Sequence, residues 1–142
     1  RSARERVLQL PDERVRERVA FMATAILGSR LIAAAAGRAL ARMHDPRGFS
    51  VLRDLLTGFR TQGRTLAVQT IGELRLSELS NELVRLSERP RAVDPAALAT
   101  SLANLADRDP EAARALQKLA NRTDGYGQAA RATLTEESRL GV

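Results

Sequence analysis

The chain has 142 residues and a formal net charge of +6, with 44% hydrophobic residues, 3% aromatic residues and no cysteine. This length fits one domain with its own core, and the shortage of aromatic residues favours an aliphatic core between helices over a sheet sandwich. The missing cysteine excludes disulfides, thiolate metal sites and a cysteine nucleophile, and no apolar run is long enough to cross a bilayer. We therefore expect a single all-α domain over residues 1–142, located in the cytoplasm.

Caps and chain breakers divide the sequence into eight expected helices that are joined by short turns. Their ranges are 11–27, 30–43, 46–59, 64–74, 76–88, 95–106, 110–121 and 124–137. Three of them open on an Asp-Pro pair, at residues 45–46, 94–95 and 109–110. The aspartate caps free backbone N–H groups, and proline fits the first helical position because its missing N–H has no partner there. The repeated use of this start predicts a regular arrangement of helices.

The helices pair into units that start at similar intervals. The unit starts lie near Pro11, Pro46, Ser77 and Pro110, which are 35, 31 and 33 residues apart. Such a period is typical of an α-solenoid, in which each helix pair buries its apolar face against its neighbours. The sequence therefore predicts an α-solenoid of about four helix pairs, and an irregular helical bundle is the alternative.

One stretch resembles a known repeat. Ala39-Leu40-Ala41-Arg42-Met43 ends a helix, His44-Asp45-Pro46-Arg47-Gly48 forms a turn, and Leu52, Leu55 and Leu56 follow in the next helix. This pattern is similar to the HEAT-like repeat family, and Ile71-Gly72-Glu73-Leu74 resembles the end of another such helix. The resemblance implies a superhelix of helix pairs that serves most often as a protein-binding scaffold.

Catalytic and ligand-binding patterns are weak in this sequence. His44 and Asp45 resemble a base with its orienting carboxylate, but Asp45 has the position of a helix cap and no nucleophile motif accompanies the pair. Asp107 and Asp109 lack the further ligands of a calcium loop. We expect no enzyme, no metal site and no cofactor. Tyr126, the only tyrosine, is interpreted either as a packing residue or as an exposed contact residue.

The positive charge is concentrated in the first half of the chain. Arginine supplies 22 of the 23 basic residues, and Lys118 is the only lysine. Residues 1–75 carry a formal charge of +7, whereas residues 76–142 carry −1. The arginines either form a basic surface for phosphate or an acidic protein, or they only solvate polar helix faces.

We expect a noncatalytic protein–protein interaction scaffold whose concave, Arg-rich surface is lined by the second helix of each pair. The partner-binding residues expected from helical phase are Arg30, Arg38, Arg42, Arg64, Gln69, Thr100 and Asn104. The partner is expected to present an acidic surface, which such arginines would orient. The alternative function is binding of a nucleic-acid backbone. A role like that of the phycobilin lyases, which share the HEAT-like repeat, is the third interpretation, and no residue motif supports it.

The chain is either a whole domain or a segment of a longer solenoid. Residues 1–10 look like the tail of an element whose partner is missing. An apolar end face would then be exposed, and a homodimer through this end face is expected.

Overall fold

The computed structural model describes the backbone of residues 13–25 and 30–140, and the side chains of residues 13–19 and 35–140. Within these ranges the chain has eight α-helices, one short 3-10 helix and no strand, so the all-α prediction is confirmed. The elements are α2 (Glu13–Ala25), α3 (Arg30–Arg42), α4 (Pro46–Thr57), α5 (Thr61–Glu73), η1 (Ser77–Leu79), α6 (Ser80–Glu88), α7 (Pro95–Ala106), α8 (Pro110–Ala120) and α9 (Gly125–Arg139).

Three helix boundaries at two turns differ from the expected ones. The third expected helix ends at Thr57 instead of Phe59, because the chain becomes extended at Gly58. The next helix begins at Thr61 instead of residue 64, since a helix tolerates an interior glycine such as Gly63 at a cost of about 1 kcal/mol. The fifth expected helix opens as the 3-10 turn η1. The remaining described boundaries lie within two residues of the expected ones.

The three aspartate caps that the sequence predicts all form, and Asp124 is a fourth. Asp45, Asp94 and Asp109 accept hydrogen bonds from the backbone N–H groups of residues 47, 97 and 111, respectively. Asp124 accepts from the N–H groups of residues 126 and 127 at the start of α9. Asp45 is 6% exposed, and a hydrogen bond from the Arg47 side chain lowers the pKa of its carboxyl. Each cap satisfies donors that helix geometry would otherwise leave free.

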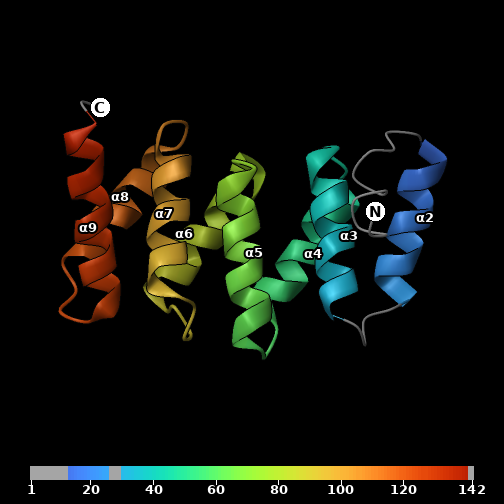
Figure 1. Ribbon diagram of the computed structural model, residues 1–142, viewed down its shortest axis with the longest axis horizontal. Helices are drawn as coiled ribbons and strands as arrows, with labels where there is room; N and C mark the ends of the chain where they lie inside the picture. The colour runs from blue at the N-terminus through green and yellow to red at the C-terminus, as the bar shows by residue number, and fades with distance from the viewer. Residues whose placement is uncertain (1–12, 26–29, 141–142) are drawn as a thin grey trace.

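The helices alternate between two layers from α3 onward. A front layer is formed by α3, α5, α7 and α9, and each of them contacts the next. A rear layer is formed by α4, α6 and α8, and α6 packs against α8. In Figure 1 the front-layer helices all run in the same direction, with their N-terminal ends at the bottom of the view. The turns of the chain therefore gather along two opposite edges of this layer.

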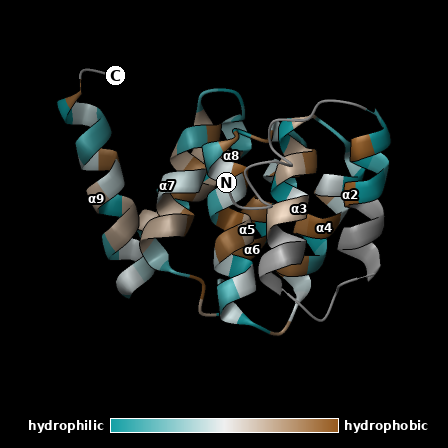
Figure 2. Cartoon of the chain, turned by 45° about the vertical axis from the view of Figure 1, so that its right-hand side comes forward, coloured by the Kyte–Doolittle hydropathy of each residue, from teal (hydrophilic) through white to brown (hydrophobic). Residues whose placement is uncertain are grey.

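The core lies between the two layers. One continuous cluster of buried residues extends from Ala41 in α3 to Ala130 in α9, and leucine supplies most of its large side chains. The leucines of α6 and α7 that follow helical spacing are all buried. Figure 2 shows hydrophobic residues concentrated on α4, α5 and α6. The core has no large aromatic side chain besides Phe49 among the described residues.

Small residues allow the helices to approach closely. A Cβ atom at Gly48 in α4 would lie 2.5 Å from the Ala41 backbone nitrogen of α3. At Gly72 in α5 a Cβ atom would lie 2.6 Å from the Cβ of Ser101 in α7. The Ser101 hydroxyl donates a hydrogen bond to the Val68 carbonyl at 2.8 Å, so this contact also satisfies a buried polar group. These two crossings fix α3 against α4 and α5 against α7.

The turns after α3 and α5 have the same backbone conformation. His44 follows α3 with φ 54°, and Arg75 follows α5 with φ 51°. In both turns the residue with positive φ donates its N–H to a carbonyl three residues earlier, and the next residue donates to a carbonyl five residues earlier. This is the Schellman termination of a helix, in which glycine is the usual residue at the left-handed position.

The C-terminal end of the array is polar on its outer side. Exposed positions of α9 include Gln128, Arg131, Thr135 and Arg139, and Leu140 follows with 78% exposure. The expected homodimer through an apolar end face stays a prediction, and residues 1–10, which suggested it, lie outside the described residues. Within the described part of the chain, every helix is too short or too polar to cross a membrane.

Replacing the left-handed histidine with glycine is expected to stabilise the fold. A non-glycine residue in the left-handed conformation costs about 1–2 kcal/mol of folding free energy, and glycine removes this cost. The greater conformational freedom of glycine in the unfolded chain offsets part of the stability gained. We expect His44→Gly to raise the free energy of unfolding by about 0.5–1 kcal/mol in urea denaturation. The control is Thr100→Gly at an exposed position inside α7, which should lower it by about 0.3–0.5 kcal/mol. A loss of stability in both variants would contradict this account of the turn.

Candidate partner-binding surface

All seven residues expected to bind a partner lie on the front layer. Arg30, Arg38 and Arg42 are in α3, and the others are in α5 and α7. The Arg30 side chain lies outside the described residues. Arg42 is exposed at the last position of α3 and has no carboxylate partner among the described residues. Arg38 is mostly buried, and its guanidinium pairs with Glu73 of α5 at 2.5 Å. Pairing therefore neutralises one of the arginines that were expected to attract a partner.

The neutral residues of the set differ in their accessibility. Gln69 and Thr100 are exposed on α5 and α7. Asn104 is half-buried, and its side-chain amide donates a hydrogen bond to the Gly72 carbonyl at 3.3 Å. The structure thus leaves Arg42, Gln69 and Thr100 as exposed members of the expected surface, on three helices of the same layer.

Arg64 is not a surface residue, which corrects the expectation. It is only 4% exposed, and its guanidinium donates to the Gly58 carbonyl at 2.7 Å and to the Arg91 carbonyl at 2.5 Å. It also donates to the Thr61 hydroxyl at 3.2 Å. The helix start at Thr61 places Arg64 on the inner side of the first turn of α5, which periodicity alone did not show. Arg64 therefore joins two turns of the chain and is unavailable to a partner.

The segment of residues 89–94 is held from both sides. From α5, Arg64 binds the Arg91 carbonyl, and the Thr65 hydroxyl accepts a hydrogen bond from the Asp94 N–H at 3.2 Å. From α9, the Tyr126 hydroxyl donates to the Val93 carbonyl at 2.6 Å. Tyr126 is half-buried, and burial raises the pKa of its hydroxyl. The single tyrosine is thus mainly a packing residue that ties α9 to the turn before α7.

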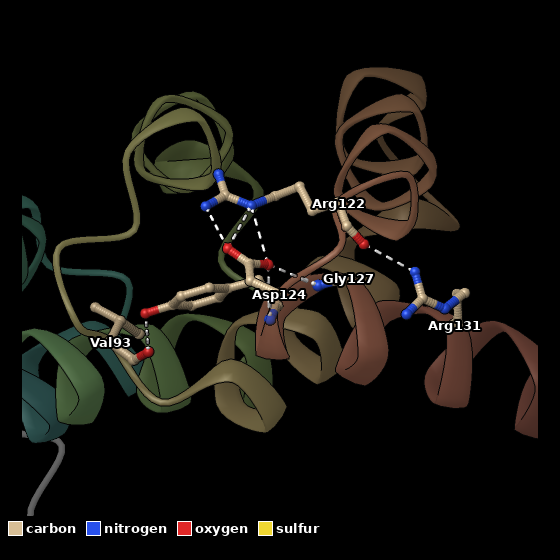
Figure 3. A network of polar contacts seen from close by, with 6 residues as sticks. Val93, Arg122, Asp124, Gly127 and Arg131 are labelled. Atoms are coloured by element: carbon tan, nitrogen blue, oxygen red, sulfur yellow. Dashed lines mark hydrogen bonds and ion pairs between the residues drawn. The ribbon is translucent and has the colours of Figure 1, made fainter.

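An ionic network fixes the start of α9, as Figure 3 shows. The Arg122 guanidinium pairs with the Asp124 carboxylate at 2.6 Å and lies over the Tyr126 ring, 5.5 Å from its centroid. The hydrogen bond from Arg122 lowers the pKa of Asp124 from 3.8 to about 2. Arg131 donates to the Arg122 carbonyl at 2.9 Å, and Gly127 leaves room for this carbonyl, since a Cβ there would lie 1.8 Å away.

These contacts build a rigid edge at the N-terminal ends of α5, α7 and α9. We call it the N-terminal edge and define it as residues 58–61, 89–95 and 121–125. Arg91 and Ala92 have φ angles of 50° and 62°, and each left-handed residue of this kind costs about 1–2 kcal/mol. The surrounding hydrogen bonds and the buried Val93 hold this strained conformation. Strain that the surroundings maintain is often found at functional sites.

The N-terminal edge displays Phe59, Arg89 and Arg91, to which the sequence analysis gave no role, and Arg60, which it counted among the arginines of a possible basic surface. Phe59 is 97% exposed, and the three arginines are exposed without a carboxylate partner within the described ranges. The sequence places Phe59 at the end of a helix, where an aromatic residue normally packs inward. Only the extended backbone at Gly58 turns it to the outside. The only sequence feature that indicates an exposed Phe59 is its position in a turn, directly between a glycine and an arginine.

A pocket lies in the rear layer. This pocket of about 440 Å³ between α6 and α8 is lined by Glu88, Lys118 and Arg122 together with small or neutral residues. None of the seven expected partner-binding residues lines it.

Across the described side chains, no three histidine, aspartate or glutamate residues are grouped as a metal site requires. His44 is exposed in its turn, apart from this pocket.

The chain matches no protein-family model, no curated protein and no solved structure. The HEAT-like resemblance therefore stays a prediction that rests on the residues of this chain.

Removing the buried guanidinium is expected to loosen the N-terminal edge. Arg64→Met keeps an apolar stem of similar length but leaves the Gly58 and Arg91 carbonyls without their donor. Hydrogen bonds from a charged group are worth about 1.5–3 kcal/mol, so we expect a loss of that size in the free energy of unfolding. Chemical denaturation measures it, with Arg42→Met as the exposed control. Equal stability of the two variants would show that Arg64 does not join the two turns.

The Arg122–Asp124 pair makes part of the stability dependent on pH. The folded pKa of Asp124 is about 2, below its ordinary value of 3.8, so its contribution is complete above about pH 4 and is lost as the pH falls toward 2. We therefore expect Asp124→Asn to lower the melting temperature at pH 7 and the difference from the wild type to shrink between pH 4 and pH 2. The control is the same scan on Asp107→Asn, an exposed carboxylate without an ion pair among the described residues. A constant difference for Asp124→Asn across this range would contradict the role of its charge.

Proposed function

We propose that the chain is a HEAT-like α-solenoid and acts as a noncatalytic scaffold that holds an acidic protein partner on its front layer. The observation that supports this most is the parallel course of α3, α5, α7 and α9 in one layer, with the turns collected along two edges. The equivalent terminations after α3 and α5, which recur 31 residues apart at His44 and Arg75, are consistent with a structural repeat. A layer of this kind offers an extended surface whose residues come from successive helices.

The exposed chemistry of the front layer suits a polar protein interface. Gln69 and Thr100 supply neutral hydrogen-bonding groups, and Arg42 supplies a charge that no described carboxylate neutralises. Arginine is enriched at protein interfaces, and an unpaired one increases the association rate and orients a partner of opposite charge. We expect an acidic partner because of these exposed residues; the buried Arg64 does not contribute to this expectation.

Binding of nucleic acid is the alternative function. The arginines of the N-terminal edge that have no carboxylate partner among the described residues favour it, since they are suited to phosphate groups. The same edge carries the exposed carboxylate of Asp94, with the exposed Glu88 directly before it, and these repel a continuous phosphate backbone. A protein can match such a mixture of charges residue by residue, which is why we place the protein partner first.

The test is capture of partners from cells that make this protein, followed by mass spectrometry with and without nuclease. The test variant adds negative charge to the front layer by Arg42→Glu, Gln69→Glu and Thr100→Glu. The control variant makes the same change in charge on exposed positions of the rear layer by Asn81→Glu, Arg85→Glu and Gln117→Glu. We expect the test variant to retain at least about tenfold less of a nuclease-resistant protein partner, because like charges meet at the interface.

The control variant should retain this partner as the wild type does. If both variants lose the partner equally, net charge alone attracts it, and this result would contradict a front-layer interface. Recovery of nucleic acid without a protein partner would favour the alternative function.

A further inference from the structure

The side chain of Phe59 is the largest apolar group that the described chain leaves in solvent. It is 97% exposed, whereas Phe49, the other described phenylalanine, is 8% exposed in the core. A phenylalanine buries a large area when it is covered, and aromatic residues with neighbouring arginines often dominate protein interfaces. Phe59 therefore has the character of an interface residue whose covering group belongs to another molecule.

The surroundings of Phe59 are fixed before any partner binds. The carbonyls of Gly58 and Arg91 accept hydrogen bonds from the same guanidinium, that of Arg64, at 2.7 and 2.5 Å. The turn that carries Phe59 and Arg60 must therefore lie beside the turn that carries Arg91. The Tyr126 hydroxyl holds the second turn from the opposite side through Val93. A preformed surface loses less conformational freedom on binding, so more of its contact energy appears as affinity.

The charges next to Phe59 indicate the chemistry of the covering group. Arg60, Arg89 and Arg91 are exposed and lack carboxylate partners among the described residues. They thus attract an acidic group, while the Phe59 ring attracts an apolar one. The carboxylate of Asp94, which is also exposed on this edge, disfavours a uniformly charged phosphate backbone.

We propose that Phe59, Arg60 and Arg91 form the anchor point for an acidic polypeptide segment of the partner, whose apolar side chains cover the Phe59 ring and whose carboxylates pair with the arginines. This inference rests on the proposed scaffold function and gives it a defined contact site. Arg64 is a positioning residue for this site, because it holds the two turns together without touching the partner.

Fluorescence anisotropy with synthetic 15-residue peptides tests the anchor. The first peptide alternates glutamate and aspartate with leucine and tryptophan. A second replaces the acidic residues with glutamine, and a third replaces the apolar residues with serine. A single-stranded DNA of 15 nucleotides is the fourth probe. We expect the full chain to bind the first peptide at least about tenfold more tightly than the other three probes, because both the ring and the arginines contribute.

Variants of the chain assign this binding to the anchor. Phe59→Ser and Arg91→Glu should each weaken binding of the first peptide about tenfold or more. The matched controls, Leu140→Ser at the other exposed apolar residue and Arg85→Glu on the rear layer, should bind as the wild type does. Circular dichroism checks that each variant is folded, which is expected since all four side chains are exposed.

Several results would overturn the proposal. These are no binding of the first peptide, equal binding of the glutamine peptide, or unchanged binding by Phe59→Ser. Tighter binding of the DNA that depends on Phe59 would assign the anchor to nucleic acid instead. The capture experiment with the front-layer variants uses other residues, so a partner lost there but retained by Phe59→Ser would keep the scaffold function and reject this anchor.

Discussion

The arrangement of this protein depends on burying an aliphatic core that contains almost no aromatic residues. Leucine and alanine fill space only when helices approach closely, because packing contacts are lost across even small gaps. Gly48 and Gly72 permit this approach at the crossings of α3 with α4 and of α5 with α7. The resulting cluster runs without interruption from α3 to α9, so each helix pair depends on its neighbours. The two-layer order and the parallel front helices follow from this dependence.

Close packing of the helices leaves most of the charged groups at the turns and on the outer faces. Several arginines are used within the fold, such as Arg38 with Glu73, Arg122 with Asp124, and the buried Arg64 with two carbonyls. The net charge of +6 is therefore a poor guide to binding, because many of the cations that produce it already have partners. What distinguishes the N-terminal edge is the opposite situation, in which arginines without a carboxylate partner among the described residues share the edge with an exposed phenylalanine on a fixed backbone.

Stability and binding are linked through the turns. The strained Arg91–Ala92 backbone persists because Arg64, Val93 and Tyr126 contribute enough to hold it. The same contacts orient the exposed groups of the edge, so the partner that we propose would meet a surface that is already ordered. The proposed scaffold would gain from this arrangement, since ordering a flexible turn on binding would reduce its affinity. The polar outer side of α9, by comparison, presents little apolar surface to a partner.

The sequence by itself determined the all-α class, the eight helices and the aspartate caps, because capping and helical periodicity act within a few residues of the chain. It also located three exposed residues of the front layer, Arg42, Gln69 and Thr100. Only the tertiary structure decided that Arg64 is buried and that Phe59 is exposed. Both outcomes depend on the exact start of α5 and on the segment of residues 89–94, which is about 27 positions away from Arg64 in the sequence. Contacts between such distant segments leave no periodic signal in the sequence, so helical spacing alone did not show that Arg64 reaches the Arg91 carbonyl.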